Sequence, residues 1–95
     1  MFVITLRYLA ELDRIDEAME AHKAWVDGQY DDGVFVASGV MVPRTGGVIL
    51  AAGLERPELE ARLALDPFLQ KGLAEYDVVE FAPRRVAPGL ERLQG

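Results

Sequence analysis

The sequence predicts an α+β fold of the ferredoxin-like type, in which a four-stranded antiparallel sheet carries two helices on one face. Two observations support this prediction. Stretches rich in β-branched and aromatic residues alternate with stretches in which apolar residues recur every three or four positions, giving the order strand, helix, strand, strand, helix, strand. The two middle strands are separated only by a short segment with proline and glycine, which is typical of a turn.

The first half of the chain contains a strand, a helix and a second strand. Residues 2–9 ("FVITLRYL") are β-branched and aromatic, which predicts a strand. The period then becomes helical, with an apolar stripe that comprises Ile15, Met19, His22, Val26 and Tyr30. Asp13 is placed to cap the start of this helix, and Gly33 is placed to end it. Residues 34–42 ("VFVASGVMV") predict the next strand.

The second half continues with a strand, a helical region and a last strand. Residues 46–53 predict a strand that forms a hairpin with the preceding one through "PRTG". Pro57 suits the first turn of a helix, whose apolar side consists of Leu59, Leu63 and Leu65. Pro67 ends that run, and a short helical segment starts afresh from Asp66. Residues 76–83 predict the final strand.

The strand over residues 34–42 has apolar side chains on both faces, unlike a strand with one face in water. Simple alternation places Val34, Val36, Val40 and Val42 on one face and Phe35, Ala37 and Met41 on the other. Two helices can cover only one face of the sheet. The hydrophobic fraction of 51% is also high for a domain of this size. We therefore expect a homodimer in which two sheets pack face to face.

Length and composition limit the classes of protein to which the chain can belong. Its 95 residues suit one domain, which we expect over residues 1–83 with an irregular tail over residues 84–95. The net charge of −6 argues against nucleic acid as a partner. With no cysteine and a single histidine, we expect neither a metal site nor a cofactor. A leader-like segment and a membrane-length apolar run are both missing, so we expect no membrane partner and a cytoplasmic location.

His22, in the stretch "AMEAHKAWVDG", is the main candidate for chemistry. It lies on the apolar stripe of the first helix, so it could be a buried structural histidine bonded to a backbone carbonyl. It could equally be an imidazole that transfers protons, which requires a carboxylate to orient the ring. Asp66 is the best candidate for that carboxylate, although an Asp before Pro is also a natural helix cap. The two tasks of Asp66 are compatible, because its carboxylate has two oxygens.

Five further residues are candidates for contact with a small-molecule ligand. Trp25 and Phe68 would supply apolar walls of a cleft between the first helix and the sheet. Ser38 offers a hydroxyl, and Gly39 leaves room for a ligand, although the pair could equally mark a bulge. Arg44 could attract an anionic substrate, or it could be an ordinary exposed turn residue.

Taken together, the single histidine in the first helix, "SG" in the second strand and "DPF" followed by glycine four residues beyond Phe68 resemble the YciI-like (YCII-related) family. The hairpin "VPRTGGVIL" is similar to a recurrent subgroup of this family. The resemblance covers nearly the whole chain. It implies the dimeric α+β barrel fold, a homodimer, and a His–Asp pair as the proposed active site, which corresponds to His22 and Asp66. Some members of this family take part in the breakdown of substituted aromatic compounds, including dehydrohalogenation.

We therefore predict a cofactor-independent acid–base enzyme that performs lyase- or isomerase-like proton transfer or elimination on a small organic molecule, with aromatic compounds as one candidate class. His22 would move the proton and Asp66 would orient the ring. The main alternative is a dimeric module that binds a small ligand or a partner without turnover. Haem binding through His22 is a third reading. An RNA-binding role is disfavoured, because the strands lack the exposed aromatic and basic residues that such a role needs.

Overall fold

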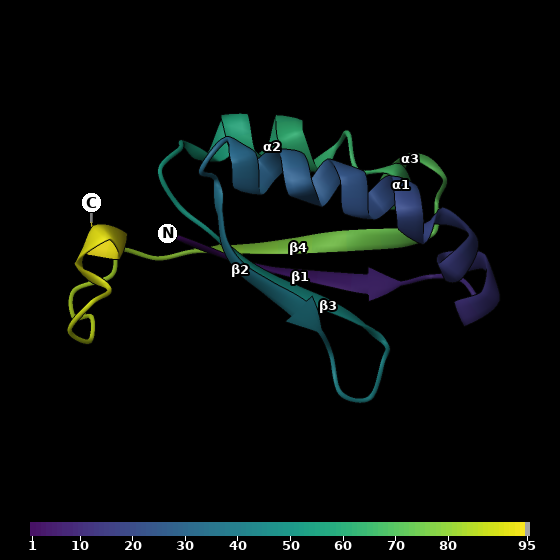
Figure 1. Ribbon diagram of the computed structural model, residues 1–95, viewed down its shortest axis with the longest axis horizontal. Helices are drawn as coiled ribbons and strands as arrows, with labels where there is room; N and C mark the ends of the chain where they lie inside the picture. The colour runs from purple at the N-terminus through teal and green to yellow at the C-terminus, as the bar shows by residue number, and fades with distance from the viewer. Residues whose placement is uncertain (95) are drawn as a thin grey trace.

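The computed structural model describes residues 1–94 and has the predicted order of elements. Three helices and four strands are followed by a short 3₁₀ helix (Figure 1). Their bounds are β1 Phe2–Tyr8, α1 Leu12–Asp31, β2 Phe35–Val40, β3 Gly46–Ala51, α2 Arg56–Leu63, α3 Pro67–Gln70, β4 Ala74–Glu80 and η1 Glu91–Gln94.

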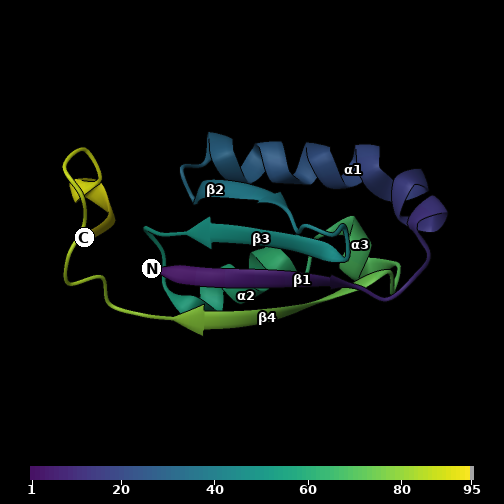
Figure 2. The same ribbon diagram turned by 90° about the horizontal axis from the view of Figure 1, so that it is seen from below.

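The four strands form one antiparallel sheet in the order β2-β3-β1-β4, as Figure 2 shows from the side that the helices leave open. All three helices lie on the other side of the sheet (Figure 1). This is the ferredoxin-like α+β arrangement that the sequence predicts, the protomer fold of the dimeric α+β barrel class. The two central strands are the first and third in the chain, so residues of β1 lie beneath the helices.

The core between helices and sheet consists of two clusters of buried apolar side chains. The first lies beneath α2 and comprises Phe2, Ile4, Val34, Phe35, Ile49, Ala51, Leu59 and Leu63. The second lies where α1 and α3 meet the sheet and comprises Leu6, Ile15, Ala18, Phe68, Leu73 and Ala74. Alternate residues of β1 enter both clusters, because successive side chains of a strand point to opposite faces. The second cluster anchors the short helix α3.

Two side chains depart from their predicted places in the helices. Asp13 does not cap α1: the residue at the cap position is Glu11, and Asp13 lies inside the first turn, where the carboxylate accepts a hydrogen bond from the Arg14 N–H (2.9 Å). Leu65 does not join the apolar side of α2 but is 61% exposed beyond its last turn. Leu59 and Leu63 are buried as predicted.

Strand β2 contains a bulge that simple alternation does not reveal. Phe35 pairs with Ala51, whereas Ala37 already pairs with Leu50, so the register shifts between Phe35 and Ala37. Phe35 is buried under the helices and Ala37 is exposed. The prediction that these two side chains share a face is wrong, because the extra residue of a bulge reverses the alternation beyond it.

The side of the sheet away from the helices keeps an apolar centre. Register places Val3, Val48, Leu50 and Val79 on this face, and they are partly or largely exposed. The most exposed of the four is Val79, at 61%. Figure 1 shows no element of the described chain over this face. We call these four residues the outer sheet patch.

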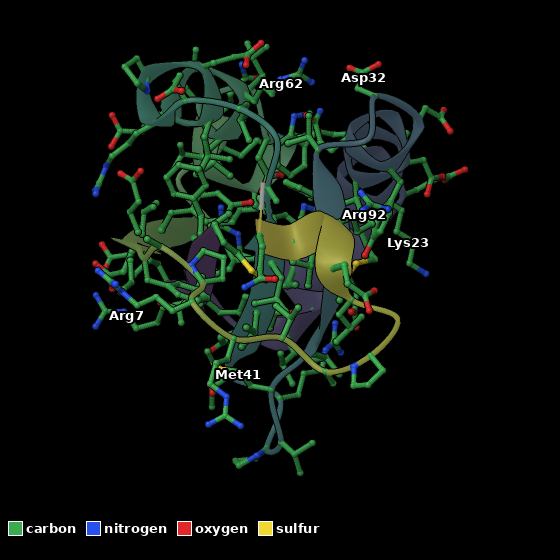
Figure 3. The ribbon with its side chains drawn as sticks, turned by 90° about the vertical axis from the view of Figure 1, so that its left-hand side faces the viewer. Arg7, Lys23, Asp32, Met41, Arg62 and Arg92 are labelled. Atoms are coloured by element: carbon green, nitrogen blue, oxygen red, sulfur yellow. The ribbon has the colours of Figure 1, made fainter. Side chains whose placement is uncertain are left out.

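A polar network ties α2 to the end of α1. Arg62 donates to Asp32 (2.8 Å) and to the Gln29 side-chain oxygen (2.9 Å), and Figure 3 shows Arg62 and Asp32 close together at one end of the molecule. Gln29 is itself 7% exposed and donates to the Trp25 carbonyl (3.3 Å). The network fixes the helix pair that flanks the first core cluster.

The residues after β4 run away from the sheet and end in η1 (Figure 1). The Gln94 side chain donates to the Arg84 carbonyl at 3.0 Å and closes this segment on itself. Leu90 is 47% exposed. Among the helices of residues 1–94, none combines the length and apolar character needed to cross a membrane.

Candidate active site

Asp66 lies between α2 and α3 and is completely buried. It caps α3, because its Oδ1 accepts a hydrogen bond from the Phe68 N–H at 3.0 Å, and Pro67 occupies the first turn. The Asp-Pro pair therefore forms the helix start that the sequence predicts. A buried carboxylate is costly unless hydrogen-bond donors surround it, so its remaining contacts decide its chemistry.

The ring of His22 meets this carboxylate from α1. Its Nδ1 lies 2.7 Å from Asp66 Oδ1. The ring stacks on Phe68, with centroids 4.0 Å apart and planes 7° from parallel. Its side chain is 13% exposed. Since a carboxylate accepts hydrogen bonds, Nδ1 carries the proton and Nε2 holds the free lone pair when the ring is neutral.

A third donor reaches Asp66 from β4. The Tyr76 hydroxyl donates to Asp66 Oδ2 in a short hydrogen bond. Burial raises the pKa of the Tyr76 phenol, and the charge of the neighbouring carboxylate raises it further. The phenol therefore stays protonated and acts as a donor. Asp66 thus receives three donors from three elements, which is the environment that an ionised carboxylate needs.

Beside His22 is a cavity of about 420 Å³ between α1, the sheet and the β2–β3 connection. The volume suits a small ligand. Its walls combine apolar side chains with a few polar groups, and they comprise Leu6, Tyr8, Met19, His22, Lys23, Val26, Asp27, Ser38, Gly39, Val40, Arg44, Gly46, Gly47, Ile49 and Phe68. Lys23 is labelled in Figure 3, where its side chain extends outward. An imidazole, an apolar wall and open space are therefore adjacent.

Four of the five residues predicted for ligand contact line this cavity, namely Ser38, Gly39, Arg44 and Phe68. Phe68 is wholly buried and lies beneath the His22 ring. Trp25 is not among the described residues that line the cavity. Its ring packs edge-on against Phe35 at a centroid distance of 5.6 Å and lies partly buried against the first core cluster. Its place in a ligand cleft is therefore not supported.

Two of the polar groups in the cavity wall already have partners. Arg44 Nη2 forms an ion pair with Asp16 Oδ1 of α1, and its guanidinium lies 6.0 Å from the centre of the Tyr8 ring. The pKa of Arg44 is raised, chiefly by the hydrogen bond to Asp16. Ser38 Oγ lies 2.7 Å from the Tyr30 hydroxyl. Arg44 thus links the hairpin to α1 and does not present an unpaired charge to the cavity.

None of the three tyrosines, Tyr8, Tyr30 and Tyr76, was assigned to the candidate site from the sequence alone. Tyr76 pairs with Leu6 in the β1–β4 register, so it faces the helices. That register is a long-range property, and no local motif marks it. Within residues 1–94, there is no group of three or more histidine, cysteine or acidic side chains arranged to hold a metal ion.

The comparison with known protein families gives a definite result, because the YCII-related domain matches residues 1–82. The chain belongs to the YCII-related domain family. No curated protein matches the YCII-related chain.

Among solved structures, the chain is similar to 5-chloro-2-hydroxyhydroquinone dehydrochlorinase (TftG) from Burkholderia phenoliruptrix AC1100, in complex with 2,5-dihydroxybenzoquinone. The identity is 17% and the TM-score is 0.70, over 85% of this chain and 93% of that chain. At this identity the likeness establishes the shared fold.

Proposed function

We propose that this YCII-related protein is a cofactor-independent acid–base enzyme that carries out proton transfer or elimination on a small aromatic molecule. The observation that carries the proposal is the 2.7 Å contact between His22 Nδ1 and Asp66 Oδ1 beside a cavity of about 420 Å³. The dehydrochlorinase with the same fold acts on a chlorinated hydroquinone and supports this reaction class.

His22 Nε2 is the general base in this proposal. Asp66 accepts the Nδ1–H bond, holds the ring in the tautomer with Nε2 free, and stabilises the imidazolium that forms when Nε2 takes a proton. Loss of a halide leaving group with its bonding electrons then completes the elimination, so that the net change is loss of HX from the substrate. The proton returns to solvent from Nε2. A single general base of this kind accounts for about 10²–10⁴-fold of rate.

The walls of the cavity favour a flat apolar molecule. Leu6, Val26 and Ile49 line it from β1, α1 and β3, and Ser38 and Gly39 line it from the edge strand β2. Gly39 pairs with Val48, so the open space at its Cβ position lies on the outer face of the sheet, and Gly39 contributes only backbone to the cavity wall. Ser38 would position an oxygen of the substrate. Arg44, already paired with Asp16, contributes to the wall rather than to capture of an anion.

The direct test is halide release from chlorinated hydroquinones, measured with a chloride electrode and by quinone absorbance. We expect turnover by the wild-type chain and a loss of about 10²–10⁴-fold in kcat for His22→Ala. Asp66→Asn should lose activity, because a neutral amide does not stabilise the imidazolium that forms on His22. Leu65→Ala, an exposed position after α2, is the control and should keep full activity. Unchanged turnover in His22→Ala would contradict the mechanism.

The same assay addresses the non-catalytic alternative, a module that binds a small ligand without turnover. The His22–Asp66 contact and the cavity beside it favour catalysis, because binding alone does not require an oriented imidazole. Binding of 2,5-dihydroxybenzoquinone without halide release from any chlorinated hydroquinone would favour the alternative.

We further propose that the protein is a homodimer joined through the outer sheet patch of Val3, Val48, Leu50 and Val79. The patch lies on the face that the helices leave open, and it is apolar at its centre. A second copy of the chain would bury the same patch twice around a two-fold axis. Two sheets packed in this way make the barrel-like core that the family resemblance implies.

A further inference from the structure

The two oxygens of Asp66 have different partners. Oδ1 receives both the Phe68 N–H at 3.0 Å and the His22 ring at 2.7 Å, so it serves the helix cap and the imidazole together. Oδ2 receives the Tyr76 hydroxyl. In the described part of the chain, Tyr76 is the one partner found for Oδ2. The helix cap does not involve this hydroxyl, so the bond needs another explanation.

A buried carboxylate oxygen without a donor is strongly disfavoured, and a donor on Oδ2 draws negative charge away from Oδ1. Both effects act on the His22–Asp66 pair. The ionised carboxylate becomes less basic, and it attracts a proton on the imidazole less strongly. A general base must be free of its proton at the working pH, so weaker attraction keeps more of His22 in the active form.

We propose that Tyr76 is a positioning residue of this site, whose hydroxyl orients the Asp66 carboxylate and lowers the pH at which the His22–Asp66 pair takes up a proton. The inference rests on the proposed function for its meaning in catalysis. The contact itself joins β4 to α3, and through Asp66 to α1. The pairing of β4 with β1 therefore places the Tyr76 hydroxyl against Asp66, and Asp66 in turn contacts the proposed base, His22.

Other charged and titratable groups near the same cavity also contribute to the electrostatic environment of the His22–Asp66 pair. They come from α1, from β1 and from the β2–β3 connection, and they are Lys23, Asp27, Tyr8 and Arg44 with its partner Asp16. No hydrogen bond from any of them to Asp66 is found in residues 1–94. Their contribution to the electrostatic environment of the pair is therefore the same in wild type and in Tyr76→Phe.

The test is an NMR titration of the His22 ring, which is the only histidine signal of the untagged chain. We expect Tyr76→Phe to move the titration midpoint of the ring to higher pH. Tyr8→Phe removes a hydroxyl from the same cavity without touching Asp66, and it should move the midpoint much less. An unchanged midpoint in Tyr76→Phe, or an equal shift in both variants, would overturn the proposal.

A second measurement covers the case in which Tyr76→Phe does not fold. In a chain with Tyr8→Phe and Tyr30→Phe, 3-fluorotyrosine can be incorporated at Tyr76 alone, the third of three tyrosines. Fluorination makes the phenol a stronger donor, so the midpoint should move to lower pH. A shift to higher pH or none at all would contradict the proposal.

Neither titration requires turnover, so the result is separate from the fate of the proposed function. A shifted midpoint in a chain without dehydrohalogenase activity would uphold the role of Tyr76 and reject the reaction. If the reaction is found, the acid limb of the kcat/KM profile should move to higher pH in Tyr76→Phe by the same amount as the midpoint. A limb that stays in place would overturn the link to catalysis.

Discussion

At the scale of single residues, Asp66 joins the fold and the proposed chemistry through one carboxylate. It is fully buried, and its three hydrogen bonds come from a ring, a backbone amide and a phenol. The cap alone explains why an aspartate precedes Pro67. The contacts to His22 and Tyr76 explain why the side chain is completely buried, which a cap does not require.

Replacement of Asp66 by Asn should cost more stability than loss of one cap. Asn keeps an oxygen that can accept from both the Phe68 N–H and the His22 ring, but its amide nitrogen, in the place of Oδ2, cannot accept from the Tyr76 hydroxyl. We expect Asp66→Asn to lower the free energy of unfolding by about 1–3 kcal/mol in urea denaturation. Asp13→Asn, in the exposed first turn of α1, should change it by less than about 0.5 kcal/mol. Equal effects of the two variants would contradict this account of Asp66.

Tyr76 should also make stability depend on alkaline pH. Because its pKa is raised in the folded chain, the unfolded chain ionises the phenol first, near an ordinary pKa of about 10. The stabilisation is complete below that pH and is lost as pH rises above it, at up to about 1.4 kcal/mol per pH unit. Urea denaturation between pH 9 and about 11 should show this extra loss for wild type and not for Tyr76→Phe. An equal loss of unfolding free energy in wild type and Tyr76→Phe over this pH range would contradict the prediction.

At the scale of elements, the order of strands and helices could be predicted, because it depends on local period and on turn residues. The start of α3 could be predicted for the same reason, from Asp66 and Pro67. The bulge in β2 could not, since nothing in the alternation of "VFVASGV" marks the extra residue. Trp25 does not line the cavity with His22, because residues three apart on a helix differ by about 60° in direction. His22 therefore faces α3, while Trp25 turns toward Phe35.

The pairing of β1 with β3 depends on close approach at Gly46. A Cβ built there would lie 1.8 Å from the Leu6 carbonyl oxygen, which is backbone and cannot move aside. Gly46→Ala should therefore destabilise the sheet by about 1–3 kcal/mol or more, measured by thermal unfolding. Gly39→Ala, on the neighbouring strand with nothing within 4 Å, should cost much less. The reverse order would show that this approach does not limit the pairing.

At the scale of the whole molecule, one face of the sheet is covered by helices and the other holds the outer sheet patch (Figure 1). The sequence predicts this asymmetry, because apolar residues on both faces of a strand need two partners. It does not reveal which side chains form the patch, since that depends on the long-range register that brings β1, β3 and β4 side by side.

The proposed dimer can be tested with a matched pair of charges. Val79 in the patch and Leu65 after α2 are each 61% exposed in the protomer. We expect wild type and Leu65→Lys to run at twice the 10.5 kDa of one chain in light scattering, and Val79→Lys to shift toward the monomer. A monomeric wild type, or a dimer that persists unchanged in Val79→Lys, would contradict the proposed interface.

The central claim, that Asp66 holds His22 with Nε2 free beside the cavity, is tested most directly by the two-bond ¹H–¹⁵N spectrum of the single histidine. The account predicts a neutral ring with the proton on Nδ1 at alkaline pH, and a shift of the Nε2 resonance when 2,5-dihydroxybenzoquinone is added. A neutral ring with its proton on Nε2, indifferent to the added quinone, would contradict it.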